Sequence, residues 1–247
     1  MRLLTEFDSR DPRRGLAIDE TLLESVRHGG DDAIRLWVND PAIVVGRSQS
    51  VCDEVDMDAA MAQGIAVLRR ISGGGTVYHY GGNLNATVAL RDGRRIGSVL
   101  ETFRFFGSAV AAALDELCSA IRFDENDLLI GEAKVGGAAQ ARRGNALLYH
   151  TTVLIHPPAV AMDRLLLAMR PGYRPRHVAS RPRQTASLSE AIGSHVSMDR
   201  VAALVAEGMA NALGLALVAS SLTVGEERRA QELVEAKYGD DAWNRSL

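Results

Sequence analysis

The stretch DLLIGEAKVGGAAQARRGNALLYHTTVLIH, residues 127–156, decides the fold class because it predicts a series of β-hairpins. Three strand-length runs, DLLI, AKVGGAAQARRGN and ALLYHTTVLIH, follow one another, and prolines 157 and 158 end the last of them. Consecutive hairpins of this kind pair antiparallel. The stretch therefore predicts a sheet that is largely antiparallel.

The chain around this stretch alternates between expected strands and helices. Apolar runs predict strands at 2–7, 33–38, 42–47, 65–71 and 83–90, the second and third joined by the turn Asn-Asp-Pro. Helical spacing and apolar density predict helices at 16–30, 57–63, 99–121, 197–215 and 225–239, and a loop is expected at 171–187. Because strands mostly precede helices, the fold class is α+β, or mixed α/β with a largely antiparallel sheet flanked by helices.

Composition favours an ordinary soluble protein. The 247 residues fit one large domain spanning 1–247, and a hydrophobic fraction of 47% with 24% charged residues supports a substantial core. A net charge of −3 gives no reason to expect a nucleic-acid partner, and no apolar run is long enough for a membrane span. The two cysteines, Cys52 and Cys118, are too few for a disulfide framework, so a cytoplasmic location is expected.

A second informative stretch is RRISGGGTVYHYGGNLN, residues 69–85. Three consecutive glycines carry a large entropic cost on folding, so their backbone must be needed. They could form a tight turn between two strands, or leave N–H groups bare for an anionic ligand. Arg69 and Arg70 favour the second interpretation, because the arginine fork binds phosphate and carboxylate groups.

Lys134 is the third feature, because four small residues follow Val135. A lysine with such neighbours is either an exposed strand residue or one whose surroundings admit a ligand. Asn126 and Asp127 similarly either form a turn or belong to a site.

Several common kinds of site are not indicated. The six histidines show no zinc-ligand spacing, and GRSQS lacks the last glycine of the hydrolase motif G-x-S-x-G. The glycines of residues 73–75 match neither a dinucleotide-binding fingerprint nor a Walker loop.

Several blocks of the sequence, taken together, resemble the lipoate–protein ligase A family, which is related to the biotin ligases and octanoyltransferases. The resemblance rests on IRLWVNDPAIVVGRSQ, RRISGGGTVYH followed by GNLN, NDLL with AKVGGAAQ, LLYHTTVLI and the terminal AKYGDDAWN, in the family's order. It implies a catalytic domain like those of class II aminoacyl-tRNA synthetases and biotin ligases. The family's C-terminal accessory domain is expected to be absent, because the chain stops soon after Trp243.

The resemblance also implies roles for individual residues. Lys134 and Arg70 would be catalytic, and Asp127 would lie near a magnesium ion. Contacts with ATP or lipoyl-AMP are implied for Arg70, Ser72, Gly73, Gly74, Gly75, Thr76, Val77, Tyr78, His79, Asn83, Asn126, Asp127, Lys134, Gly137, Ala138 and His150. ATP and Mg²⁺ would be needed, lipoate would be a substrate, and no tightly bound cofactor is expected.

The chemistry explains these residue types. Joining a fatty carboxylate to AMP brings two anions together, so the site needs positive charge and bare N–H groups rather than a nucleophile of its own. The resemblance implies that the acyl group then passes to a lysine of a lipoyl-acceptor domain, such as a 2-oxoacid dehydrogenase E2, a glycine cleavage H protein or a related protein. A separate C-terminal accessory subunit is a further expected partner.

Two departures from the family keep alternatives open. Tyr80 follows His79 where the family usually has aspartate, which could alter acceptor docking, and the short length also occurs among octanoyl- and lipoyl-transferases. A transferase would need an activated cysteine, but Cys118 is expected to be buried in an apolar helix and Cys52 has acidic neighbours. A catalytically silent lipoyl-domain binder is the other alternative. Biotin ligation is disfavoured because its G-R-G-R-x-G loop is missing. The basic segment 171–187 resembles the family's lid.

Overall fold

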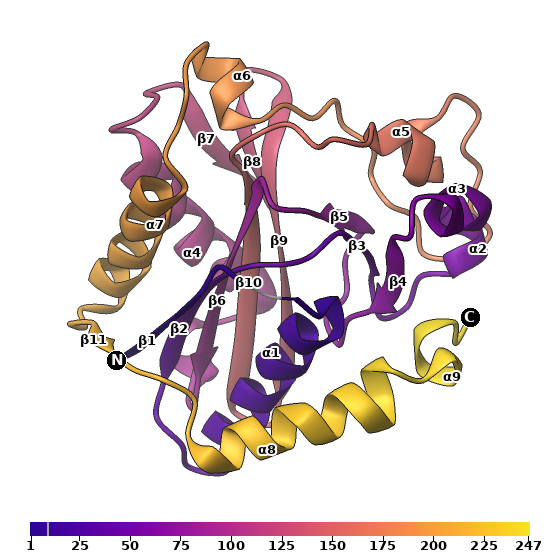
Figure 1. The fold of residues 1–247 in the computed structure, drawn as a ribbon. Helices are drawn as coiled ribbons and strands as arrows, with labels where there is room; N and C mark the ends of the chain where they lie inside the picture. Colours follow the sequence, from indigo (N-terminus) through magenta and orange to yellow (C-terminus); the bar gives the residue numbers. More distant parts are fainter. Residues whose placement is uncertain (9) are drawn as a thin grey trace.

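The computed structural model describes residues 1–8 and 10–247. They form a mixed α+β fold with one large sheet, one small sheet and helices around both (Figure 1). The strands are β1 (Arg2–Glu6), β2 (Ala33–Val38), β3 (Ala42–Val45), β4 (Ala66–Arg69), β5 (Val77–His79), β6 (Asn83–Leu90), β7 (Ile121–Asp124), β8 (Asp127–Ile130), β9 (Ala133–Arg143), β10 (Ala146–Leu154) and β11 (Val218–Ala219).

The helices are α1 (Pro12–Arg27), α2 (Val51–Glu54), α3 (Met57–Ala62), α4 (Val99–Leu114), α5 (Met162–Leu165), α6 (Leu188–Ile192), α7 (Met198–Leu213), α8 (Val224–Leu233) and α9 (Asp241–Asn244). Two 3-10 turns lie at Gly93–Ile96 and Leu167–Met169, and a π-helical turn at Val234–Tyr238. None of the helices among the described residues is both long enough and apolar enough to span a bilayer.

The large sheet has the strand order β11-β1-β2-β6-β10-β9-β8-β7. The pairs from β2 to β7 are antiparallel, which confirms the hairpins predicted at 127–156, while β1 pairs in parallel with both β2 and β11. The sheet is therefore mixed but largely antiparallel, as the sequence predicts.

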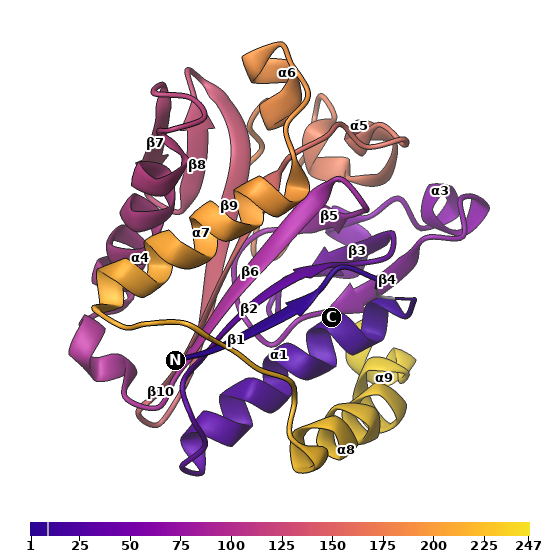
Figure 2. The same ribbon diagram turned by 60° about the vertical axis from the view of Figure 1, so that its left-hand side comes forward.

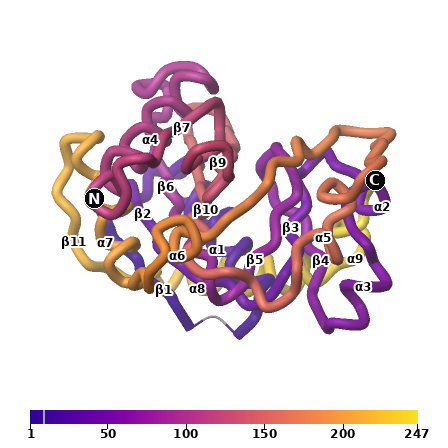
Figure 3. Tube along the Cα trace, turned by 90° about the horizontal axis from the view of Figure 1, so that it is seen from above, coloured from indigo at the N-terminus to yellow at the C-terminus, as the bar shows by residue number. Residues whose placement is uncertain are grey.

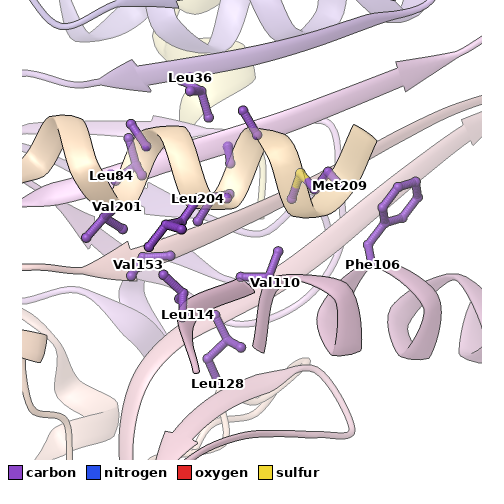
Figure 4. Packing of buried hydrophobic residues seen from close by; sticks show 14 of the residues in the cluster. Leu36, Leu84, Phe106, Val110, Leu114, Leu128, Val153, Val201, Leu204 and Met209 are labelled. Atoms are coloured by element: carbon purple, nitrogen blue, oxygen red, sulfur yellow. The ribbon is translucent and has the colours of Figure 1, made fainter. Parts of the chain in front are cut away.

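Side-chain alternation along β6 separates the two faces of this sheet. Leu84, Ala86 and Val88 point to the face covered by α4 and α7 (Figure 2), where they join a buried core with Phe106 and Met209. Figure 4 shows this packing from close by. Each fully buried aliphatic or aromatic side chain stabilises the fold by about 1.5–3 kcal/mol, so this face anchors the sheet.

The opposite face of β6 carries polar residues. Asn83, Asn85 and Thr87 are all buried there, on the side covered by α1, against which α8 packs in turn (Figure 1). Buried polar groups need partners, and these residues face the side of the sheet where the main cavity opens.

The small sheet, in the order β4-β3-β5, corrects the interpretation of the three glycines as a tight turn between paired strands. β4 and β5 are not a hairpin, because β3 lies between them and pairs in parallel with β4 and antiparallel with β5. The glycines of residues 73–75 thus belong to a loop that crosses the end of β3. The strands predicted at 33–38 and 42–47 are confirmed as β2 and β3, with the predicted turn between them, and they belong to different sheets.

The helix predicted at 99–121 is too long. α4 ends at Leu114, and Ile121 already begins β7, which pairs with β8. The apolar residues of β7 continue the pattern of the helix because they pack beneath it: a Cβ added at Gly107 would lie 2.2 Å from the ring of Phe123. Cys118 follows α4 in a turn and is partly exposed, so its expected burial in a helix is wrong.

Candidate active site

A cavity of about 1070 Å³ opens between the large sheet, the loop before β5, the N-terminal turns of α4 and the segment 178–181. In Figure 3 the chain between α5 and α6, drawn in orange, runs across from the side of the small sheet towards β9. The predicted site residues that line the cavity are Arg70, Gly73, Gly74, Gly75, Thr76, Val77, His79, Asn126, Asp127, Lys134, Gly137, Ala138 and His150.

The glycine loop presents unpaired backbone donors. Across residues 1–8 and 10–247, no hydrogen-bond acceptor is found for the N–H groups from Ser72 to Gly75. Gly74 has φ +86°, and a Cβ added at Gly46 would lie 2.1 Å from the Gly74 carbonyl oxygen. Both positions therefore require glycine, and the bare N–H groups suit an anion.

Arg70 holds this loop in shape. Its guanidinium donates to the carbonyls of Val44 (3.0 Å), Gly73 (2.6 Å) and Gly75 (2.7 Å), and its Nε donates to Ser72 Oγ (3.0 Å). Burial lowers the pKa of the guanidinium to about 10, so Arg70 is still charged at neutral pH. In this structure it is a scaffold for the loop, and its predicted contact with a nucleotide stays a prediction.

A chain of hydrogen bonds leads from Ser72 into the protein interior. Ser72 Oγ and His150 Nε2 lie 2.7 Å apart, and His150 Nδ1 lies 3.2 Å from Asp19 Oδ2. Asp19 also pairs with Arg35 at 2.9 Å and accepts a hydrogen bond from Thr87. Both ring nitrogens of His150 are thus occupied, which fixes the ring at the cavity wall.

A β-bulge in the large sheet sets the orientation of Lys134. Leu128 pairs with Gly136 and Leu129 with Lys134, so Val135 is an extra residue of β9. The Lys134 ammonium lies 2.7 Å from Asp127 Oδ1, and a Cβ added at Gly137 would lie 2.9 Å from Nζ. The small residue at 137 makes room for the lysine itself. Only two of the 28 lysines and arginines are lysines, Lys134 and Lys237.

Asp127 does not fit a resident metal ion. Oδ1 pairs with Lys134, and Oδ2 lies 3.3 Å from Arg183 Nε. Within the described part of the chain, no three His, Cys, Asp or Glu residues cluster as metal ligands. The neighbouring Asn126 exchanges hydrogen bonds with the Ala138 backbone, at 2.7 and 3.3 Å.

The segment 173–183, here called the strap, closes one side of the cavity. Ser180 Oγ accepts from the Thr76 N–H (2.9 Å) and donates to Glu54 Oε2 (2.5 Å). Tyr173 OH and the Ser180 N–H donate to the other oxygen of Glu54, which is fully buried. A Cβ at Gly75 would lie 3.0 Å from Ser180 Oγ. The missing side chain at Gly75 thus leaves room for Ser180 of the strap.

His79 and Trp37 form the apolar inner wall of the cavity with Leu16. The two rings meet edge to face with centroids 5.6 Å apart. Burial, with the charge of Arg70 nearby, lowers the pKa of His79 to about 3, so the imidazole is neutral at physiological pH.

Three predicted residues lie outside this cavity. Ser72 is buried just behind its wall, and Tyr78 and Asn83 line a smaller neighbouring cavity of about 80 Å³ beneath the strap. Tyr80 is buried in the core of the small sheet and donates to the His156 carbonyl at 2.7 Å. Its hydroxyl therefore has a structural partner away from the cavity.

The structure also adds residues that sequence reasoning missed. Asp19, Glu54 and Ser180 were not singled out because each gains its role from a partner far away in the chain. The only local signal for Glu54 is the short acidic helix in which it lies. Neither cysteine lines the cavity, since Cys52 is exposed on α2 and Cys118 lies beyond α4.

Comparisons with known proteins agree with this geometry. Residues 11–210 match the model of the lipoyl protein ligase A/B catalytic domain. The octanoyltransferase LipM of Symbiobacterium thermophilum is 32% identical, with 98% of this chain and 97% of that protein covered. Lipoate-protein ligase A subunit 1 of Thermoplasma acidophilum is 30% identical, with 100% and 97% covered.

Solved structures give the same picture. A lipoate-protein ligase A bound with ATP has a TM-score of 0.86 and 29% identity over 100% of this chain and 98% of that chain. The bi-partite lipoate protein ligase of Thermoplasma acidophilum, described with its E2 lipoyl domain, has a TM-score of 0.82 and 29% identity over 100% and 96%.

The fold extends beyond these relatives. Biotin protein ligase of Aquifex aeolicus has a TM-score of 0.50 at 14% identity, over 94% of this chain and 74% of that chain, and shares the fold alone. Because the family model covers most of the chain and full-length relatives reach 30–32% identity, the chain belongs to the lipoyl protein ligase A/B catalytic-domain family and is a lipoate-related ligase or transferase.

Proposed function

We propose that the protein is an ATP-dependent lipoate–protein ligase. The observation that carries this proposal is a single cavity lined by both Lys134 and the glycines 73–75, whose N–H groups have no acceptor among the described residues. Two anions, a carboxylate and a nucleotide phosphate, can share such a cavity because positive charge and bare donors reduce their repulsion. The match to an ATP-bound ligase structure supports the nucleotide.

In the first half-reaction a lipoate or octanoate carboxylate oxygen attacks the α-phosphorus of ATP, and the bond to pyrophosphate breaks. Lys134 stabilises the negative charge shared by the carboxylate and the α-phosphate, while the glycine loop binds phosphate oxygens. Leu16, Trp37 and the neutral His79 give the acyl chain an apolar wall.

In the second half-reaction the lysine amine of a lipoyl-acceptor domain attacks the acyl carbon. The bond to AMP breaks and the amine loses a proton. Lys134 again stabilises the developing negative charge on the carbonyl oxygen. A relative described with its E2 lipoyl domain and a second subunit supports both kinds of partner. The need for ATP fits the cytoplasmic location expected from the sequence.

Pyrophosphate exchange tests this proposal. With lipoate, ATP and magnesium, the protein should exchange labelled pyrophosphate into ATP, and Lys134→Ala should lower the rate by about a hundredfold or more. Arg174→Gln is the control, because Arg174 is exposed and does not line the cavity. Exchange should be measured with and without a separate accessory subunit. Wild-type protein that exchanges under neither condition would contradict the ligase, and would leave a silent binding protein as an alternative.

A second candidate is an octanoyltransferase, because LipM of Symbiobacterium thermophilum matches over nearly its whole length. That reaction would transfer an acyl group from a carrier thioester without ATP, through a cysteine. Loss of ATP-independent transfer in Cys52→Ser or Cys118→Ser would favour it. Unchanged transfer in both variants would count against a cysteine intermediate.

A further inference from the structure

Asp127 is shared between a cavity residue and the strap. One carboxylate oxygen lies 2.7 Å from Lys134 Nζ, and the other lies 3.3 Å from Arg183 Nε. The Asp127 side chain is only 10% exposed, whereas Lys134 is 24% exposed and lines the cavity. Each carboxylate oxygen therefore has its own cation, and one can leave without displacing the other.

The residues directly after the strap set the backbone of Lys134. The Lys134 N–H donates to the Gln184 carbonyl at 2.8 Å, and its carbonyl accepts from the Ala186 N–H at 3.0 Å. Arg183 therefore directly precedes Gln184, the first residue that binds the Lys134 backbone. The main chain and the partner carboxylate of Lys134 are thus both held by consecutive residues of one segment.

To turn all three of its N–H donors to an anionic substrate, the Lys134 ammonium must leave Asp127. Without a second cation, that movement would leave a nearly buried carboxylate unpaired, which is unfavourable. Arg183 removes this penalty because it stays on Oδ2 and also lies 3.5 Å from Asp124 Oδ2. A rigid arginine fork suits such a shared site.

We propose that Arg183 is a positioning residue that holds Asp127 and thereby releases Lys134 to the anionic acyl substrate. This inference rests on the proposed function for its kinetic consequence, but not for the pairing itself. The position of the strap and the release of Lys134 from Asp127 are then coupled, because Arg183 contributes to both. The other strap arginine beside the cavity, Arg181, pairs with exposed Glu125 and does not reach Asp127.

The pairing can be tested without any enzymatic activity. Amine acetylation followed by peptide mass spectrometry reports on Lys134, and Lys237, held by Glu20 at 2.8 Å, is the internal reference. Only the neutral amine reacts, so an ammonium held by a sole carboxylate partner is labelled slowly. Arg183→Gln should slow Lys134 labelling about fivefold to tenfold, and Arg183→Lys should restore most of the rate. An unchanged or faster rate in Arg183→Gln would overturn the proposal.

The double variant Asp127→Asn/Arg183→Gln tests whether the slow labelling of Arg183→Gln is caused by Asp127. Removing the carboxylate should return Lys134 labelling to the wild-type rate or above it, and a double variant that still labels slowly would contradict the proposal. If Arg183 merely fastened the strap, Arg183→Gln alone would loosen the strap and speed Lys134 labelling, which also contradicts the proposal. Arg174→Gln, on the same segment, should label like wild type.

Steady-state exchange then tests the consequence. Arg183→Gln should raise the KM for lipoate about tenfold with a smaller change in kcat, and the double variant should recover part of that loss. A KM unaffected by Arg183→Gln would overturn the positioning role. If wild-type protein shows no exchange, the proposed function fails, and labelling still decides whether Arg183 controls the Lys134 pair.

Discussion

Two walls of one cavity use positive charge in opposite ways. On the glycine loop, Arg70 donates to three carbonyls and a serine, all of them belonging to the loop or to β3. On the large sheet, Lys134 has one carboxylate, whose other oxygen is already paired with Arg183. The first cation is fixed by many bonds, and the second can change partners. A site that must hold one group still and let another move requires both arrangements.

Substituting each cation by glutamine gives the largest contrast. Arg70→Gln should lower the free energy of unfolding by about 3 kcal/mol, because buried carbonyls lose their donors. Lys134→Gln should lower it by about 1 kcal/mol or less, because the pair is partly exposed and Asp127 keeps Arg183. Urea unfolding measures both. Equal losses of stability in the two variants would contradict the contrast between a fixed Arg70 and a mobile Lys134.

Gly137→Ala tests whether the position of the Lys134 ammonium matters for the reaction. The added Cβ would lie 2.9 Å from Lys134 Cε and Nζ, so the ammonium must shift and the exchange rate should fall about tenfold, with little change in stability. Gly81→Ala is the matched control, because nothing lies within 4 Å of its added Cβ. A Gly137→Ala variant with wild-type kinetics would mean that the lysine position is not critical.

Burial of His79, with the charge of Arg70 nearby, predicts a pH dependence of stability. The pKa of His79 is about 3 in the folded protein against an ordinary 6.5, so the unfolded chain binds the extra proton between these values. Stability is complete above pH 6.5 and should fall by about 1 kcal/mol from there to about pH 5.5. Replacing His79 with Asn should flatten this part of the profile in urea titrations. A variant that keeps the same slope would show that other groups cause it.

The strap gives the smallest expected effect. Trypsin can cut after exposed Arg176, and lipoate with ATP should slow that cut about threefold if bound substrate stabilises the closed strap. Ser180→Ala should accelerate it, because Glu54 and the Thr76 N–H lose a partner. Digestion followed by gel electrophoresis is sufficient, and identical patterns with and without substrate would count against a lid.

Local patterns predicted much of the fold and of the cavity lining. The hairpins of β8, β9 and β10, the limits of α7 and the bare glycine loop all depend on neighbours in sequence. Pairing between distant segments leaves no such signal. The insertion of β3 between β4 and β5 excludes a tight turn between paired strands at the glycines, and β7 was not predicted because its apolar residues continue the pattern of α4. The role of Glu54 likewise depends on Ser180, 126 residues away.

The scarcity of lysine has a chemical consequence of its own. An activated acyl group reacts with any accessible neutral amine, including those of the protein that made it. In this chain the side-chain amines are Lys134, paired with Asp127, and Lys237, paired with Glu20 and stacked 3.9 Å from the Trp243 ring. Arginine supplies the remaining 26 of 28 basic side chains and does not accept acyl groups at neutral pH. Intact mass measured after turnover should therefore show little self-acylation, and introducing an exposed lysine, as in Arg104→Lys at the cavity rim, should create a target.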